Sequence, residues 1–209
     1  MNFMVSYNLQ NLSSPQITIQ CLRKGDVLTL DKDYKNLYII IGGVLHLGKL
    51  SLNNQIITMA ILKFKQCFII SNSSQYQLKS VTTSSLLIIK LNDLSDLISQ
   101  IPELFSLITH GLLEYCKVME TFSYIYRRKT TYKRILLLLL FLIKYFGVNT
   151  SNGIKISLKF SQADIAQILG TTRTSVNRVF QILQKMKYLE IYANIIIIKE
   201  PLYLIGNSL

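Results

Sequence analysis

The chain has 209 residues, half of them hydrophobic, which suffices for one large or two small domains with a filled core and argues against disorder. Lys and Arg exceed Asp and Glu by 23 to 11, giving a formal net charge of +12. This charge favours anionic partners such as nucleic acid, acidic lipid or acidic protein. Three separated cysteines with no Cys/His cluster argue against a zinc or iron–sulfur site and suit a reducing compartment.

Neither a secretory leader nor a membrane span is expected. The first 14 residues lack the charged start and unbroken apolar stretch of a signal peptide. The most apolar run, Ile135–Ile143, has roughly half the length that a membrane span needs, so it predicts a buried helix.

The positive charge is unevenly distributed. Up to Cys116 the chain has 9 basic and 7 acidic residues, a net of +2, and beyond Cys116 it has 14 and 4, a net of +10. This division indicates an anion-binding C-terminal module beside a near-neutral N-terminal one. Drift combined with a need for solubility is the alternative explanation.

Residues 17–91 predict a small antiparallel β-barrel or jelly roll, because short β-rich runs alternate with turn residues. Gly42-Gly43, between two apolar runs, is the strongest hairpin signal. Other turns are expected at Lys24-Gly25-Asp26, Asn53-Asn54 and Ser71–Ser74. The expected strands are Ile17–Leu22, Val27–Leu30, Leu37–Ile41, Val44–Leu50, Gln55–Leu62, Tyr76–Val81 and Leu86–Leu91.

The pattern then becomes helical. Asn92–Ile101 predicts a short helix, and from Glu103 onward apolar residues recur at steps of three and four, which keeps them on one face of a long helix. This stripe consists of Phe105, Ile108, Leu112, Tyr115, Met119, Phe122 and Tyr126, widened by Leu104, Leu107, Leu113 and Cys116. So broad an apolar face favours a dimer interface, with a fully internal helix as the alternative. The basic cluster Arg127-Arg128-Lys129 predicts the end of the helix and a hinge.

A second helical region follows the hinge. Tyr132–Phe146 predicts a helix that Gly147 caps, Asn149–Gly153 a turn and Ile154–Leu158 a short strand.

The segment Ser161–Met186 has the pattern of a helix-turn-helix. Ser161 and Asp164 stand in a capping box at the start of a short helix, and Gly170 permits the left-handed turn that ends it. Thr171 or Thr172 caps the second helix. The residues expected in the buried contact are small or apolar: Ala166 at the crossing point, then Val176, Val179, Phe180 and Leu183.

The opposite edge of the second helix is polar. Arg173, Thr174, Asn177 and Arg178 fall away from the apolar stripe, so they are free to enter a DNA major groove, where Arg suits guanine and Asn suits adenine or a phosphate. A hairpin around Ala193-Asn194 completes a winged helix. Phosphate contacts are expected from Thr130, Thr131, Tyr132, Lys133 and Ser161.

The order of β-roll, long helix, GTTRTSVNRVFQIL and wing resembles the CRP/FNR superfamily of transcription regulators. FGVNTSNGIKISLKFSQADIAQILGTTRTSVNRV resembles the NtcA branch, the global nitrogen regulators of cyanobacteria, and its plastid-encoded relatives in red algae; LRKGDVLTLDKDYKNLYIIIGGVLHLGKL and PELFSLITHGLL resemble it more weakly. The resemblance implies an α+β fold: a β-roll at 1–101, a dimerisation helix and hinge at 102–129, and a winged helix-turn-helix domain at 130–209.

The resemblance also implies function: a homodimer on a near-palindromic DNA site, acting on nitrogen-related genes, as an activator in contact with RNA polymerase. Arg173 and Arg178 correspond to family arginines that face base edges, and Thr174 is uncharged, as in the NtcA branch. The full set expected at DNA is Ser161, Gln162, Thr171, Thr172, Arg173, Thr174, Ser175, Asn177 and Arg178.

The sensor half departs from the family pattern. The Gly-Glu pair and the Arg-Ser/Thr-Ala stretch of cyclic-nucleotide binders are missing, so cAMP is not expected. The resemblance points instead to 2-oxoglutarate, although Ile69 replaces the Gly of the Phe-Gly pair and the loop after it lacks Arg. The candidate effector residues are Phe68, Ile69, Ile70, Arg128 and Lys129, and a solvated basic hinge is the alternative role for the last two.

Three other functions are alternatives to this reading. The first is an effector-independent architectural DNA-binding dimer. The second is a cupin-like enzyme, which is not expected because His46 and His110 are the only histidines and no metal set forms. The third is a membrane-surface protein, which leaves the Ala–Gly–Val pattern unexplained, so no membrane partner is expected. The amino-acid composition is typical of an AT-rich genome. Together with the resemblance, it predicts a protein of the plastid stroma, or otherwise of a bacterial cytoplasm.

Overall fold

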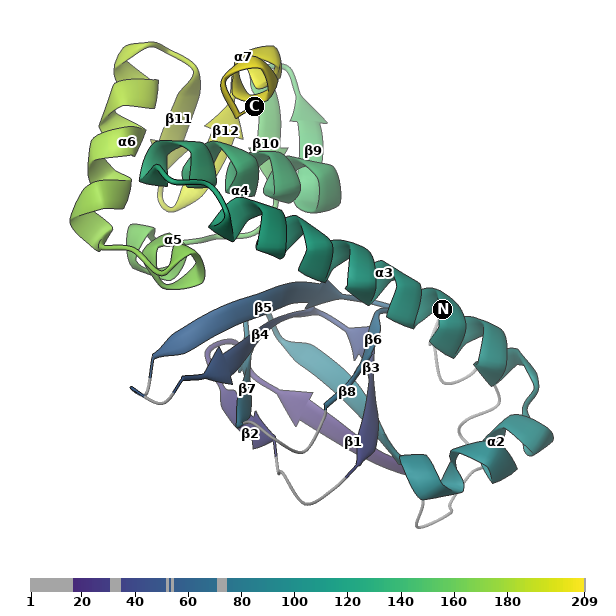
Figure 1. Ribbon diagram of the computed structural model, residues 1–209. Coiled ribbons are helices and arrows are strands. Elements are labelled where there is room, and N and C mark those ends of the chain that lie inside the picture. Colours follow the sequence, from purple (N-terminus) through teal and green to yellow (C-terminus); the bar gives the residue numbers. More distant parts are fainter. Residues whose placement is uncertain (1–16, 31–34, 52, 54, 71–74, 209) are drawn as a thin grey trace. The chain divides into compact units, whose positions relative to one another are not determined.

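The computed structural model describes residues 17–30, 35–51, 53, 55–70 and 75–208. The chain forms two compact units, residues 1–120 and 121–209 (Figure 1). The boundary lies inside the long helix, which the sequence analysis had placed in a segment of its own. The first 14 residues, the expected turn Ser71–Ser74 and Asn54 of the expected turn Asn53-Asn54 lie outside the described residues.

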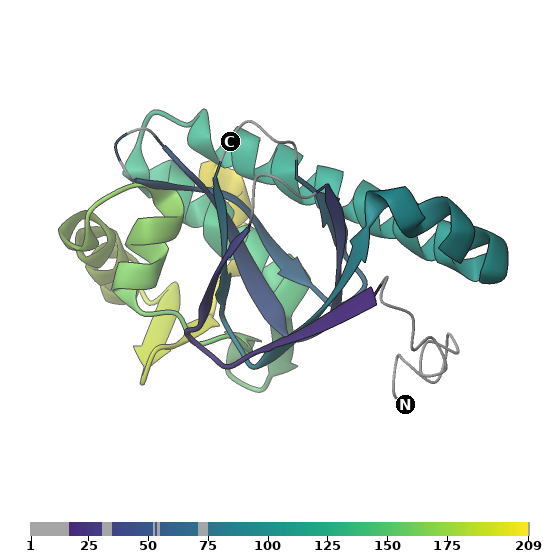
Figure 2. The ribbon, with the colours of Figure 1, turned by 90° about the horizontal axis from the view of Figure 1, so that it is seen from below.

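The first unit contains two four-stranded antiparallel sheets, with strand orders β1-β8-β3-β6 and β2-β7-β4-β5. Figure 2 shows their strands from below, coloured from purple to teal. Non-consecutive strands are neighbours in both sheets, as in a jelly roll, so the predicted N-terminal β-roll is confirmed. The strands are β1 Ile17–Leu22, β2 Val27–Leu30, β3 Asn36–Gly42, β4 Val44–Leu50, β5 Ile56–Lys63, β6 Cys67–Ile69, β7 Tyr76–Ser80 and β8 Ser84–Lys90.

The hairpin predicted at Gly42-Gly43 is wrong. Strand β3 pairs with β6 and β8, whereas β4 pairs with β5 and β7, so the two glycines carry the chain from one sheet to the other. Gly43 has a φ of +76°, and a Cβ there would collide with Ser84 and with the Thr83 carbonyl. The glycine pair is therefore required by a close corner against the start of β8 rather than by a tight hairpin.

The helices of the first unit close one side of the roll. A 3-10 turn, η2 Leu91–Asp93, leads into α2 Leu94–Gln100, and the long helix α3 spans Glu103–Tyr126. One core cluster joins both helices to the sheet that contains β3 and β8. Its buried residues are Leu37, Ile39, Cys67, Leu87, Ile89, Leu97, Leu104, Leu107 and Ile108. Burial in this cluster raises the pKa of the Cys67 thiol to about 12, so that sulfur stays protonated and acts as a packing group.

The second unit is a helical domain with its own small sheet. Its helices are α4 Thr131–Phe146, α5 Gln162–Leu169, α6 Arg173–Lys185 and α7 Pro201–Ser208. Its strands are β9 Gly147–Thr150, β10 Gly153–Ile156, β11 Leu189–Tyr192 and β12 Ile195–Ile198, in the antiparallel order β11-β12-β10-β9. The predicted winged helix-turn-helix architecture is confirmed, and α7 was not predicted.

The prediction that Gly147 caps α4 is confirmed, because its backbone N–H donates to the Ile143 carbonyl. Its φ and ψ of −77° and 138° are extended, so the chain passes directly into β9. The expected turn Asn149–Gly153 is too long: Asn149 and Thr150 pair with β10, Gly153 begins β10, and only Ser151-Asn152 form the turn. A Cβ at Gly147 would collide with the Ile143 carbonyl and lie 2.9 Å from Cγ2 of Ile154, so glycine here permits close packing of the strand.

Across the described residues, no helix is both long enough and apolar enough to cross a membrane. In the same part of the chain, no three His, Cys, Asp or Glu side chains gather as metal ligands.

At Gly111, helix α3 packs closely against the roll, and this contact generates a stability test. A Cβ at Gly111 would collide with Sγ of Cys67 and lie 2.7 Å from the Lys65 carbonyl oxygen. We expect Gly111→Ala to lower the free energy of unfolding by about 1–3 kcal/mol, because the strain of overpacking exceeds the helix-propensity gain of roughly 1 kcal/mol. Urea unfolding measures the change.

Gly206→Ala in α7 is the matched control, since a Cβ there meets nothing within 4 Å. This variant should unfold at the same or a higher urea concentration than the wild type. Equal stability of Gly111→Ala and the wild type would contradict the close approach.

Candidate nucleic-acid interface

The first helix of the motif, α5, begins with the predicted capping box. The backbone N–H of Asp164 donates to Oγ of Ser161 at 3.1 Å, and the backbone N–H of Ser161 donates to the Asp164 carboxylate at 3.0 Å. Two amides that a helix start leaves unpaired are thereby satisfied. The capping box fixes the residue at which α5 starts. The Ser161 hydroxyl also donates to the Asp164 carboxylate at 2.7 Å, so its proton is not free for a phosphate.

Gly170 makes the turn between the two helices. Its φ and ψ of 60° and 43° are left-handed, a conformation that costs other residues roughly 1–2 kcal/mol. The backbone N–H groups of Gly170 and Thr171 donate to the carbonyls of Gln167 and Ala166 at 3.3 and 3.0 Å. These bonds satisfy carbonyls at the end of α5 and turn the chain directly into α6.

Thr172 caps the second helix, which resolves the choice that the sequence left open. Its Oγ1 accepts from the backbone N–H of Ser175 at 3.1 Å, and the hydroxyls of the two residues are 2.9 Å apart. Below this cap the predicted apolar stripe of α6 is buried: Val176, Val179, Phe180 and Leu183. Ala166 of α5 is buried as well, as expected for the residue at the crossing point.

The other edge of α6 is polar and faces outward. Arg173, Thr174 and Arg178 are exposed, and Asn177 is half-buried. In the part of the chain that the structure describes, neither arginine forms an ion pair with a carboxylate. Because the buried stripe fixes the rotation of α6 about its axis, all four polar side chains lie on the side of the helix away from the core.

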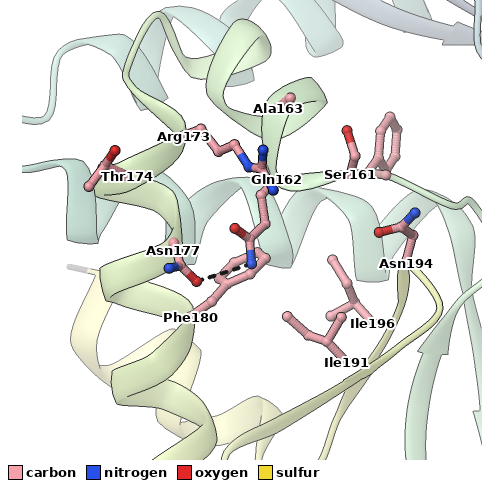
Figure 3. A pocket seen from close by; sticks show the side chains of 11 residues that line it. Ser161, Gln162, Ala163, Arg173, Thr174, Asn177, Phe180, Ile191, Asn194 and Ile196 are labelled. Atoms are coloured by element: carbon pink, nitrogen blue, oxygen red, sulfur yellow. Dashed lines mark hydrogen bonds between the residues drawn. The ribbon is translucent and has the colours of Figure 1, made fainter.

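A groove of about 890 Å³ lies between the start of α5, the polar edge of α6 and the wing (Figure 3). Five of the predicted DNA-binding residues line it together: Ser161, Gln162, Arg173, Thr174 and Asn177. The Gln162 side chain reaches from α5 toward Asn177, and its Nε2 donates to Oδ1 of Asn177 at 3.3 Å. The other four predicted residues, Thr171, Thr172, Ser175 and Arg178, do not line the groove.

The wing supplies a wall of the groove that the site predictions missed. Ala193 and Asn194 both have positive φ, 48° and 64°, as in a two-residue hairpin turn whose twist matches the flanking strands. Asn194, Ile191 and Ile196 of this hairpin line the groove, as does Ala163 of α5. The Ala193-Asn194 turn was recognisable in the sequence, but its distance from α6 was not.

The last turn of α3 is tied to the helix-turn-helix. The hydroxyl of Tyr126 donates to the Ile168 carbonyl of α5 at 2.5 Å. Arg134 of α4 donates from Nε to the Arg128 carbonyl at 2.8 Å and from Nη2 to the Tyr126 carbonyl at 3.3 Å. The guanidinium therefore satisfies the carbonyl of the last residue of α3 and a carbonyl two residues further on, so the segment predicted as a hinge is a hydrogen-bonded junction.

The further residues that the sequence analysis assigned to phosphate have structural contacts of their own. Thr130 caps α4 by accepting from the backbone N–H of Lys133 at 3.3 Å. The hydroxyls of Tyr132 and Tyr203 are 2.9 Å apart, and burial together with this bond raises the pKa of Tyr132. Thr131 begins α4, and its side chain and that of Lys133 are half-buried.

The candidate effector residues lie in different units. In the first unit, Phe68 is fully buried and stacks on Tyr38 with ring centroids 4.9 Å apart, while Ile70 is buried and Ile69 is 39% exposed. In the second unit, the guanidinium of Arg128 lies 4.1 Å from the centre of the Tyr124 ring, and Lys129 is exposed. The two groups thus belong to separate units, and an effector site remains a prediction.

Comparison with known proteins supports the resemblance drawn from the sequence. Residues 133–205 match the model of the Crp-like helix-turn-helix domain. The putative HTH-type transcriptional regulator ycf28 of Porphyra purpurea is 27% identical over 199 residues, covering 93% of this chain and 83% of the relative. The global nitrogen regulator of Nostoc sp. is 27% identical over 177 residues, covering 81% and 79%. The resemblance to CRP/FNR regulators of the NtcA kind is thus confirmed.

Solved structures show the same fold. A CooA mutant from Carboxydothermus hydrogenoformans superposes with a TM-score of 0.79 at 19% identity, covering 100% of this chain and 95% of that chain. FixK2 from Bradyrhizobium japonicum gives a TM-score of 0.72 at 17% identity, covering 92% and 98%. The predicted combination of β-roll, long helix and winged helix-turn-helix is therefore that of CRP-like proteins.

The left-handed turn at Gly170 generates a test of the interface. We expect Gly170→Ala to lower the free energy of unfolding by about 1–2 kcal/mol, because a Cβ there meets nothing within 4 Å and only the backbone conformation is penalised. Gly170→Asn should lose less, since asparagine tolerates this conformation. Urea unfolding of the three proteins gives the order, and an alanine variant as stable as the wild type would contradict the assigned turn.

Proposed function

We propose that this protein is a sequence-specific DNA-binding transcription regulator of the CRP/FNR type. The observation that carries the proposal is the outward polar edge of α6, on which Arg173 and Arg178 stand without carboxylate partners among the described residues. A helix that begins after a tight turn and projects arginines is suited to the major groove, where a guanidinium binds guanine O6 and N7. The excess of 14 basic over 4 acidic residues beyond Cys116 supplies attraction to phosphate.

A homodimer is part of the proposal. Helix α3 carries exposed apolar side chains, with Phe105 62% and Leu113 54% exposed, in a stripe that also contains the half-buried Leu112 and Met119. A second α3 packed along this stripe would remove these side chains from water. Two symmetric recognition helices would then read half-sites roughly 34 Å apart, about one turn of DNA, on a near-palindromic site.

The proposed biological role is based on similarity to the relatives. Similarity to global nitrogen regulators favours nitrogen-related genes as targets. Activation through contact with RNA polymerase is the mode of action that we propose. Similarity to ycf28 and the Ile-, Asn- and Lys-rich composition favour the plastid stroma. The proposed mechanism is binding without catalysis.

The two arginines provide the first test of this function. We expect Arg173→Ala and Arg178→Ala each to weaken binding to the selected DNA site by about 1–3 kcal/mol and to relax base preference at one position per half-site. Electrophoretic mobility shifts on the native site and on single-base variants measure both quantities.

Lys185→Ala is the matched control, because Lys185 is exposed in the last turn of α6, away from the expected base contacts. It should leave base preference unchanged. If both arginine variants bound the native site as tightly as the wild type, the assignment would be refuted.

We further propose 2-oxoglutarate as the effector; the candidate residues for its recognition are Phe68, Ile69 and Ile70 in the first unit and Arg128 and Lys129 in the second. The alternative is an effector-independent architectural dimer. The buried stack of Phe68 on Tyr38 favours that alternative, because it fills space beside β6 with aromatic rings.

Calorimetry decides between the two. We expect 2-oxoglutarate to release or absorb measurable heat on binding and to tighten DNA binding by about 5- to 150-fold, the usual range of allosteric coupling. Succinate, which lacks the keto group, is the ligand control, and Arg128→Gln should weaken the response. No heat and unchanged DNA affinity would leave the architectural dimer as the function.

A further inference from the structure

Another pocket lies within the first unit, where the turn between β5 and β6 meets the first half of α3. Its volume is about 560 Å³, which is in the range of small-molecule sites. The two walls touch at Gly111, where a Cβ would lie 2.7 Å from the Lys65 carbonyl oxygen. The helix and the turn are therefore packed directly against each other, and the pocket is formed without any ligand.

The wall formed by the turn is cationic, with Lys63 and Lys65. Lys65 has a φ of +70°, a left-handed conformation that disfavours any residue with a side chain. Its backbone N–H donates to the Ile40 carbonyl at 2.9 Å, and the backbone N–H of Lys63 donates to Oε1 of Gln66 at 2.8 Å. Glycine would occupy this turn with less strain, so a lysine here favours a use for its ammonium group.

The wall formed by α3 is acidic. Glu103 begins the helix, and Glu114, further along it, forms an ion pair with Lys117 at 2.7 Å. Glu103 and Lys65 line the same pocket, yet neither has an ion-pair partner among the described residues. The pocket thus keeps a positive and a negative charge apart on its two walls.

Gln66 adds an unpaired hydrogen-bond donor to the cationic wall. The residue is 3% exposed and lines the pocket, and its Nε2 group has no hydrogen-bond partner in the part of the chain that the structure describes. A buried donor without an acceptor is unfavourable, and an oxygen of a bound carboxylate would supply that acceptor. This wall is therefore suited to a carboxylate, as the opposite wall is to a cation.

We propose that this pocket binds a free amino acid with an uncharged side chain, its carboxylate at Lys65 and Gln66 and its ammonium group at Glu103. The acidic wall would repel a purely anionic ligand, and the cationic wall a purely cationic one. The exposed ring of Phe64 and the apolar Leu107 line the space that is left for the ligand's side chain. The inference goes beyond DNA recognition, so its test does not depend on the proposed function.

The proposed dimer and the candidate effector residues leave this pocket free. His110, which lines the pocket, is five positions after Phe105 of the apolar stripe, a rotation of roughly 140° around α3. Tyr115 is five positions after His110, so it lies equally far round in the same sense, and its ring centroid is 6.0 Å from that of Phe68. The dimer stripe, the surroundings of Phe68 and the pocket therefore use three different sides of α3.

Lys65→Gly separates ligand binding from folding. Glycine relieves the left-handed strain and removes the ammonium group, so this variant should unfold at a higher urea concentration than the wild type and yet bind the amino acid about tenfold more weakly. Lys187→Gly is the matched control, because Lys187 has a φ of +60° and lies in the second unit. It should gain stability as well and keep the wild-type affinity.

The experiment is calorimetry on the full chain, with the twenty standard L-amino acids added one at a time. We expect saturable heat from at least one that has an uncharged side chain. Its N-acetyl derivative, which lacks the ammonium charge, and its amide, which lacks the carboxylate, should each bind about tenfold more weakly. Glu103→Gln should weaken binding of the amino acid and leave binding of the N-acetyl derivative unchanged. Asp96→Asn, an exposed carboxylate on α2, should change neither.

The proposal is overturned if no amino acid with an uncharged side chain gives saturable heat. Equal affinity of the amino acid and its N-acetyl derivative, or wild-type affinity of Lys65→Gly, would overturn it as well. A matching loss of affinity in Lys187→Gly would also count against it, because the effect would then come from relief of strain rather than from the charge at the pocket.

Discussion

The interface depends on one backbone constraint, the left-handed residue at the junction of α5 and α6. Gly170 adopts φ and ψ of 60° and 43°, and the amides that follow close the end of α5 while Thr172 opens α6. A gradual loop would leave the angle between the helices free, whereas this turn leaves almost no freedom. Ala166 and Val176 are both buried, so the helices approach closely. The place of every polar residue on α6 follows from this junction.

The unit that contains the helix-turn-helix also includes the last turn of the long helix α3. Tyr126 donates to the Ile168 carbonyl at the end of α5, and Arg134 donates to two carbonyls at the end of α3. Both interactions join backbone groups to side chains with defined geometry, so the last turn of α3 and the helix-turn-helix form one hydrogen-bonded body. A rotation of that turn therefore carries the polar edge of α6 with it. In a dimer that meets through α3, the spacing of the two edges would be set at this junction.

The sequence predicted most of the fold because local signals and burial agree there. Three strands, Ile17–Leu22, Val27–Leu30 and Val44–Leu50, have the predicted bounds, and α3 runs from Glu103 to the expected hinge. The predictions failed where the outcome depended on distant residues. Strand β6 has three residues, too few to show alternation, and it exists because β3 is available as a partner. Gly42-Gly43 was predicted as a hairpin, which is wrong, and Gly147 as a helix cap, which is right; in neither case did the sequence show the close packing against other segments that excludes a side chain at Gly43 and Gly147.

The candidate site shows the same division between local and distant information. Helical periodicity alone separates the buried stripe of α6 from Arg173, Asn177 and Arg178, so the residues outside the buried stripe could be identified from the sequence. Periodicity assigns a residue to a face but says nothing about the orientation of an amide. That orientation comes from Gln162, which only the turn at Gly170 brings within 3.3 Å of Asn177. The orientation of the Asn177 amide is thus a tertiary property, which the sequence of the recognition helix alone does not contain.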